Sequence, residues 1–205
     1  MRFTLGILAA VLIGLAVGGV SALVLAGLWP RGAGVSGANA INVENWKSDF
    51  AVGSETADPY TRARIARHGL LALAQSEAVY FTRSVDDSGQ PLRENCTYRL
   101  SGVGQPARWW SITLYDADSR LPMNEDAALS IDASQAGEGP WSAIIAPEKA
   151  HESSHWISSR NAGNFDLTLR LYVPDAELLE TPGRALNPPR ISRLGCTDGE
   201  RGEAS

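Results

Sequence analysis

The first 30 residues contain an uncharged run that most constrains how this chain can fold. From Phe3 to Trp29 no residue carries a charge, and Arg2 and Arg31 flank the run. At about 1.5 Å per residue, these 27 residues would form a helix roughly 40 Å long, more than the roughly 30 Å hydrocarbon core of a bilayer requires. We therefore predict that residues 1–30 are a transmembrane anchor that contacts the membrane through residues 3–29.

A cleaved signal peptide is the alternative interpretation of this segment. A secretory signal has an apolar region of only about 7–15 residues. Ala38-Asn39-Ala40 resembles a small-x-small cleavage site, but it lies well beyond the apolar run. An uncleaved anchor is therefore favoured. Its flanking charges are too few for the positive-inside rule to orient it.

Small residues recur at four-residue spacing along the run, at Gly6, Ala10, Gly14, Gly18, Ala22 and Ala26. Gly14 and Gly18 form the GxxxG pattern, which lets two helices approach closely. The pattern predicts a packing face for a second copy or for another membrane helix. The alternative is that membrane helices are generally rich in small residues.

Charge and cysteine usage narrow the partners and the compartment. All 23 acidic residues lie beyond the anchor, together with 17 of the 18 Lys and Arg residues. Such an acidic domain argues against nucleic acid and against adhesion to an anionic membrane surface. Cys96 and Cys196 also lie beyond the anchor, which predicts one disulfide in an oxidising compartment, with two buried free thiols as the alternative.

The segments next to the anchor show linker and helix patterns. Residues 31–40, "RGAGVSGANA", read as a flexible linker, and a short strand is expected around Ile41–Trp46. Asp58 and Pro59 predict the start of one soluble helix, whose amphipathic pattern runs to Phe81. Residues 180–190 are expected to be extended, and residues 197–205 to be a disordered tail.

After Phe81 the sequence alternates as strands do. Residues 96–100, 109–115, 141–145, 156–159 and 165–172 fit strands, with turn residues at 84–91. In the clearest of them, Phe165, Leu167, Leu169 and Leu171 share one face. One helix followed by at least five short strands predicts a mainly antiparallel β-sandwich over residues 41–196.

Most catalytic and cofactor motifs are absent from the sequence. It contains no Gly-x-Ser-x-Gly, no glycine-rich phosphate loop and no Cys-x2-Cys. His151 and His155 stand four apart, but the serines between them favour an exposed loop over a metal site. We therefore expect no metal and no cofactor.

Two sets of residues remain as site candidates. Asp116 with Glu125 or Asp126 could act as an acid and base in glycoside chemistry, although such residues are also common in turns. Aromatic side chains on an outer sheet face could instead stack on sugar rings or accept an apolar ligand. The ligand-binding candidates are Arg108, Trp109, Tyr115, Asn124 and Arg160.

Several motifs together resemble the bacterial family called domain of unknown function 1214, from about Trp46 to Cys196. They are "ADPYTRARIARHGLLAL", "ENCTYRLSG", "ARWWSITLYD", "LPMNEDA", "WISSRNAGNFDLTLRLYVP" and "PPRISRLGC". Many members carry Arg-Tyr-Ser-Ile after "LYD" and "N". Here Ala128 and Leu129 precede Ser130, so a site that depends on the Arg and Tyr is not expected.

The resemblance implies a jelly-roll-like β-sandwich with no established activity, in a short membrane-anchored form. Together with the cysteines, it predicts a single-pass protein of the bacterial inner membrane with a periplasmic domain. The leading hypothesis is ligand binding or assembly without catalysis. The alternatives are a hydrolase-like enzyme acting on carbohydrate or an envelope polymer, and a structural subunit of a membrane complex.

Overall fold

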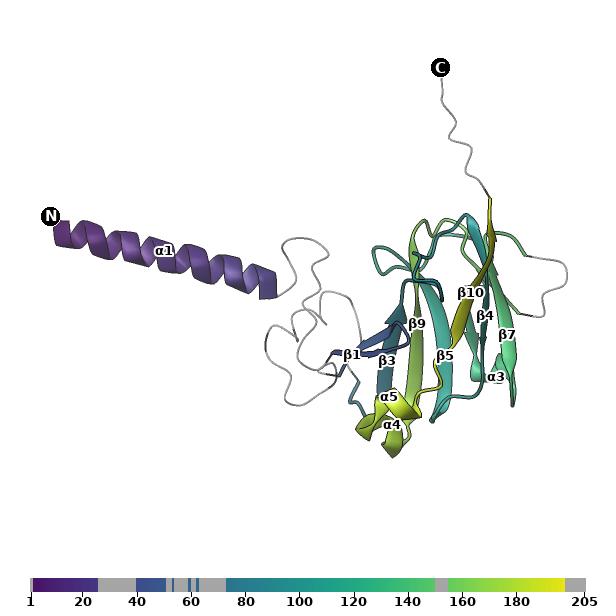
Figure 1. Cartoon of the computed structure of the whole chain (residues 1–205). Helices are drawn as coiled ribbons and strands as arrows, with labels where there is room; N and C mark the ends of the chain where they lie inside the picture. The colour runs from purple at the N-terminus through teal and green to yellow at the C-terminus, as the bar shows by residue number, and fades with distance from the viewer. Residues whose placement is uncertain are drawn as a thin grey trace, which may run out of the picture.

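The computed structural model describes residues 2–25, 40–50, 73–149 and 155–197, together with Gly53, Pro59 and Arg62. It has an N-terminal apolar helix, α1 (Arg2–Leu25), and a β-rich body (Figure 1). Within α1, the segment Gly6–Val24 is long and apolar enough to span a membrane. Its mean hydropathy is 2.6, and no part of it is buried against the rest of the protein.

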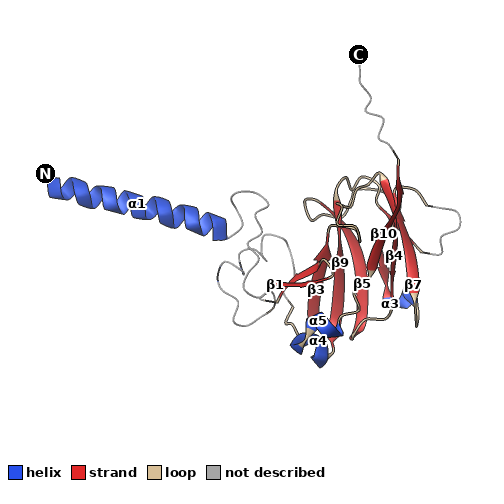
Figure 2. Ribbon diagram, in the orientation of Figure 1, coloured by secondary structure: helices blue, strands red, loops and turns tan. Residues whose placement is uncertain are grey.

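The body contains two β-sheets (Figure 2). The six-stranded sheet has the order β1-β2-β3-β9-β5-β6, and the four-stranded sheet the order β10-β4-β7-β8. Every pair is antiparallel except β7 with β8. The strands are β1 (Ala40–Val43), β2 (Trp46–Asp49), β3 (Ala78–Arg83), β4 (Cys96–Gly102), β5 (Ala107–Asp116), β6 (Ser130–Asp132), β7 (Trp141–Ala146), β8 (Trp156–Ser158), β9 (Phe165–Pro174) and β10 (Arg190–Cys196). The predicted mainly antiparallel β architecture is confirmed.

Alternating side chains build the core as predicted. Leu167, Leu169 and Leu171 of β9 are completely buried, because successive strand residues point to opposite faces. Trp110 of β5 stacks on Trp141 of β7, with ring centroids 5.0 Å apart. Residues of both sheets therefore share one hydrophobic cluster.

The predicted disulfide joins two neighbouring strands. Cys96 and Cys196 stand opposite each other in the β4–β10 register and are bonded. Thr197, the last residue described, continues the pairing by donating its backbone N–H to the carbonyl of Asn95 at 2.9 Å. The C-terminal strand is thus tied covalently to the strand beside it.

The single strand expected around Ile41–Trp46 is instead a hairpin of β1 and β2. Glu44 and Asn45 have φ of 50° and 69°, the conformation that two-residue hairpin turns require. The turn reverses the chain, so that Val43 pairs with Trp46. The alternation of apolar and polar residues did not reveal this reversal, because each of the two strands is only four residues long.

The predicted soluble helix lies mostly outside the described residues. Its last part was predicted wrongly, because Ala78–Arg83 forms β3, preceded by a turn. Val79, Tyr80 and Phe81 are β-branched or aromatic and pair along β9. This tertiary pairing overrides the helical spacing.

The prediction that residues 180–190 are extended is only partly correct, because this segment contains a short helix. Two short helices, α4 (Ala176–Glu180) and α5 (Pro182–Ala185), follow β9. Pro182 occupies the first position of α5, where its missing N–H costs nothing. Residues 31–39, His151 and residues 198–205 lie outside the described residues.

Candidate functional site

Polar and aromatic side chains alternate with the core residues of three adjacent strands, β3, β9 and β5. They lie on the face of the six-stranded sheet opposite the core. We call this set the outer row. It consists of Tyr80 and Thr82 of β3, Asp166, Thr168, Arg170 and Tyr172 of β9, and Trp109, Ser111, Thr113 and Tyr115 of β5.

Arg170 lies at the middle of the outer row, opposite Tyr80 on one side and Ser111 on the other. Its guanidinium donates to the hydroxyl of Thr113 at 3.1 Å and to the hydroxyl of Tyr115. It also lies 5.2 Å from the centroid of the Tyr115 ring. Within the described part of the chain, no carboxylate forms an ion pair with Arg170.

An aromatic pair occupies one end of the row. Trp109 and Tyr172 are opposite each other, with ring centroids 5.3 Å apart and an interplanar angle of 51°. Trp109 is 37 % exposed, and its indole N–H donates to Ser134 at 3.3 Å. Ser134 belongs to α3 (Ala133–Ala136). An exposed ring is therefore held in one orientation.

A perturbed carboxylate occupies the other end. Burial raises the pKa of Asp166 to about 6, a hydrogen bond from Thr168 opposes the rise, and the charge of Asp116 adds to it. A hollow of about 230 Å³ adjoins this end, and its lining includes Asp166, Ala117 and Asn164. Asp166 therefore becomes protonated more readily than an ordinary aspartate.

We expect Asp166→Asn to stabilise the protein above pH 6. The folded-state pKa of about 6 exceeds the ordinary 3.8, so stability is lost as the pH rises between these values. The full shift corresponds to about 3 kcal/mol in the free energy of unfolding, as an upper bound. Urea unfolding from pH 3.5 to 8 measures it, with exposed Asp118→Asn as the control. Equal unfolding free energies of variant and wild type at pH 7.5 would contradict the prediction.

The predicted acid–base residues are engaged in separate contacts. Asp116 accepts the backbone N–H groups of Asp118 at 2.9 Å and Arg120 at 2.8 Å, closing the turn after β5. Asp126 accepts from Ser158 at 2.6 Å and Arg160 at 3.1 Å. Glu125 is exposed. Asp116 also acts on Asp166, because its charge contributes to the raised pKa of that residue.

The predicted ligand-binding residues fall in different places. Trp109 and Tyr115 belong to the outer row. Asn124 and Arg160 lie together elsewhere, where the Asn124 amide donates to the Arg160 carbonyl at 2.9 Å. Arg108 is exposed and, as the neighbour of Trp109, points to the other side of β5.

Sequence reasoning did not nominate Asp166 and Arg170 as site residues. The available signal was their position between apolar residues in "FDLTLRLY", which places two charged side chains on one sheet face. The side chains opposite Asp166 and Arg170 are set by the β3–β9 and β5–β9 registers. These strands are far apart in the sequence, so local patterns do not reveal the pairing.

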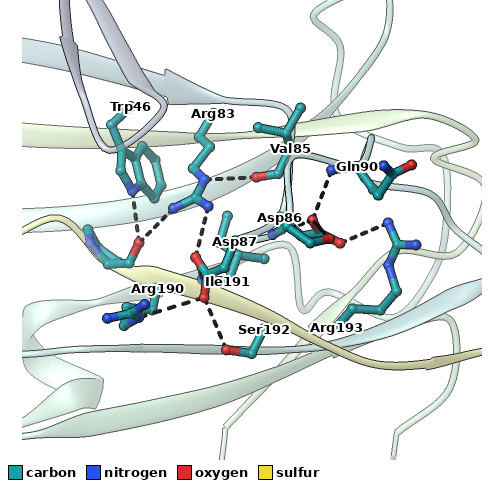
Figure 3. Close-up of polar contacts among 12 residues, drawn as sticks. Trp46, Arg83, Val85, Asp86, Asp87, Gln90, Arg190, Ile191, Ser192 and Arg193 are labelled. Carbon is teal, nitrogen blue, oxygen red and sulfur yellow. Dashed lines mark hydrogen bonds and ion pairs between the residues drawn. The ribbon is translucent and has the colours of Figure 1, made fainter.

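A second polar cluster, the Arg83 cluster, consists of Arg83, Asp86, Asp87, Arg190 and Arg193 (Figure 3). Arg83 is 2 % exposed and lies 2.8 Å from Asp87. Arg193 lies 2.8 Å from Asp86. Burial opposes ionisation of both aspartates, yet hydrogen bonds outweigh it and lower their pKa values.

The Arg83 cluster secures the outer edge of β10. The Asp87 backbone N–H donates to the Ile191 carbonyl at 2.8 Å, and the Asp87 carboxylate accepts the Ile191 N–H at 3.1 Å. An exposed strand edge invites pairing with other chains, and these contacts occupy part of it. Because both of its aspartates are paired with arginines and hold β10 in place, we assign this cluster a structural role.

Comparison with known proteins gives a match to one family and a similar fold. Residues 77–176 match the family described as "Protein of unknown function (DUF1214)", which confirms the resemblance. No curated protein matches.

Solved structures that are similar to this chain include two bacterial proteins. The VPA0106 protein from Vibrio parahaemolyticus is 20% identical with a TM-score of 0.54, over 68% of this chain and 36% of that one. An uncharacterized protein from Burkholderia cenocepacia is 10% identical with a TM-score of 0.43, over 58% of this chain and 30% of that one. This chain thus spans about a third of each, and the first likeness supports the fold alone.

Proposed function

We propose that this chain, whose residues 77–176 match the DUF1214 family, is a membrane-anchored envelope protein that binds a ligand on the outer row and does not catalyse a reaction. In this proposal residues 1–30 are a single-pass anchor, and the binding domain extends from Ala40, the first residue of β1, to Thr197, which pairs with Asn95. The domain faces the periplasm of a bacterium.

Contacts between the sheets support a jelly-roll-like sandwich as the finer description of the domain. Trp110 and Trp141 come from different sheets, and so do Tyr98 and Phe165, whose ring centroids lie 5.9 Å apart. Two sheets packed face to face interleave their inner side chains in this way.

The anchor and the compartment rest on two observations. Helix α1 has the length and hydropathy of a membrane span, and the disulfide suits an oxidising compartment. Gly14 and Gly18 form the GxxxG pattern within α1, which lets a second helix approach closely. We therefore propose that this face packs on a partner helix, in a homodimer or with another membrane protein.

One observation carries the binding function. The outer row combines an aromatic pair, in which Trp109 is exposed and Tyr172 partly buried, with a half-buried arginine whose described partners are hydroxyl groups. Flat aromatic rings beside polar groups suit a sugar, which has apolar ring faces and hydroxyl edges. We propose a carbohydrate of the envelope as the ligand, bound by Trp109 and Tyr115. A role in ligand binding for Arg108, Asn124 and Arg160 stays a prediction.

Trp109→Ala is expected to weaken carbohydrate binding at least about tenfold, which corresponds to about 1.4 kcal/mol. The full chain in detergent is titrated with envelope oligosaccharides, and the shift in melting temperature and the Kd are measured. Trp156→Ala is the control, because the Trp156 indole donates to the Ala146 carbonyl in the other sheet. Equal Kd values for both variants, or no stabilising oligosaccharide, would count against the proposed function.

A further inference from the structure

We propose that the ligand of the outer row is an acidic sugar, whose ring stacks on Trp109 and whose carboxylate binds Arg170. This inference rests on the proposed function and deepens it by naming the class of ligand. Its basis is the unusual environment of Arg170 and the distance between Arg170 and the aromatic pair.

Arg170 differs from other arginines with well-defined contacts in this protein. Arg83, Arg160 and Arg193 lie 2.8 Å, 3.1 Å and 2.8 Å from the carboxylates of Asp87, Asp126 and Asp86. The described partners of Arg170 are the neutral hydroxyl groups of Thr113 and Tyr115. These contacts orient the guanidinium without neutralising its charge.

An oriented guanidinium is suited to a carboxylate. Its planar fork of N–H donors matches the two oxygens of a carboxylate, and such pairs are frequently bidentate. The contact with the Tyr115 ring also restricts the side chain, so less freedom is lost when a ligand binds. The net charge of the chain is −5, so the selection of an anion has to come from this local positive charge.

The spacing along β9 fits one sugar ring between the two groups. Arg170 and Tyr172 are two residues apart on the same face, which corresponds to about 7 Å along a strand. Ser111 lies opposite Arg170, between Trp109 and Thr113 on β5. Its side chain is short and buried, so the proposed ring lies over it, touches the aromatic pair and carries its acid toward Arg170.

Asp166 sets the direction in which the ligand lies. It stands opposite Tyr115, on the side of Arg170 away from the aromatic pair. A carboxylate beyond Arg170 would meet this acid and its neighbour Asp116. The arrangement therefore accepts one carboxylate, at the end of the sugar that stacks on Trp109.

Matched sugars with and without the charge test the inference. The full chain in detergent is titrated with trigalacturonic acid and its methyl ester, and with N-acetylglucosaminyl-N-acetylmuramic acid and its methyl ester. We expect at least one acid to bind about tenfold or more tightly than its ester. Arg170→Met should abolish this preference, and Arg170→Lys should retain part of it because the charge remains.

Arg99→Met is the matched control, because it removes the same charge from an exposed position of β4. The melting temperature of each variant shows whether it folds. If Arg170→Met does not fold, Arg170→Lys is compared with the wild type in its place. Equal binding of acid and ester by the wild type overturns the inference and leaves the proposed function standing. Binding of neither acids, esters nor envelope oligosaccharides overturns both. An acid preference unchanged in Arg170→Met and Arg170→Lys assigns the charge recognition elsewhere and also overturns the inference.

Discussion

Removing the Cys96–Cys196 disulfide is expected to lower the free energy of unfolding by up to about 4.7 kcal/mol. The two cysteines are 100 residues apart in sequence, so the bond closes a long loop that would otherwise be free in the unfolded chain. The chain-entropy argument gives its largest stabilisation to long loops. A loss of this size is a large fraction of the 5–15 kcal/mol that is usual for a folded domain.

Urea unfolding of the full chain in detergent, with and without reductant, measures this loss. Cys96→Ala/Cys196→Ala should match the reduced wild type, and reductant should not change its unfolding. Without the disulfide, the free energy of unfolding should also fall more steeply with urea concentration, because the unfolded chain becomes more expanded and exposes more surface. Identical midpoints for the oxidised and reduced wild type would contradict the expected stabilisation.

The strands of the core could be predicted because their information is local. In β9 the leucines alternate with polar residues, and the alternation alone states that one face is buried. The pairing of Cys96 with Cys196 was also accessible, since the chain contains no other cysteine. In both cases residue type and spacing are sufficient.

The site could be predicted only in part, because its contacts depend on strand register. Trp109 and Tyr115 were recognisable as aromatic residues on an outward face. Arg170 became part of the same site only once β9 was placed between β3 and β5. Among the acids after β5, Asp116 serves the turn, which is the alternative that the sequence analysis gave for these residues.

The same limit explains why the Arg83 cluster was not anticipated. Arg83 and Asp87 flank a stretch that reads as an ordinary turn, and nothing near them in sequence indicates burial. Their partners Pro189 and Ile191 are more than 100 residues away. The cluster and the disulfide hold the two ends of β10, so removing either should expose how much the fold depends on this strand.

Arg83→Met is expected to destabilise the protein by about 3–5 kcal/mol, the range for breaking a buried ion pair by removing one partner. Arg83 is 2 % exposed, and it donates to the carbonyl groups of Val85 at 2.8 Å and Pro189 at 3.4 Å. Methionine fills a similar volume but satisfies none of these acceptors. The loss should lie near the low end of the range, because Asp87 is 25 % exposed and water can reach it.

Arg190→Met separates this effect from a general loss of positive charge. Arg190 also pairs with Asp87, but at 3.7 Å and with its side chain 71 % exposed. An exposed pair of this kind contributes about 0–1 kcal/mol. Chemical unfolding of both variants should therefore give a several-fold larger loss for Arg83→Met. Similar losses would mean that the cluster acts through net charge alone. Recovery of stability in Arg83→Met/Asp87→Leu would instead identify the uncompensated carboxylate as the source of the loss, because an apolar pair leaves no charge to solvate.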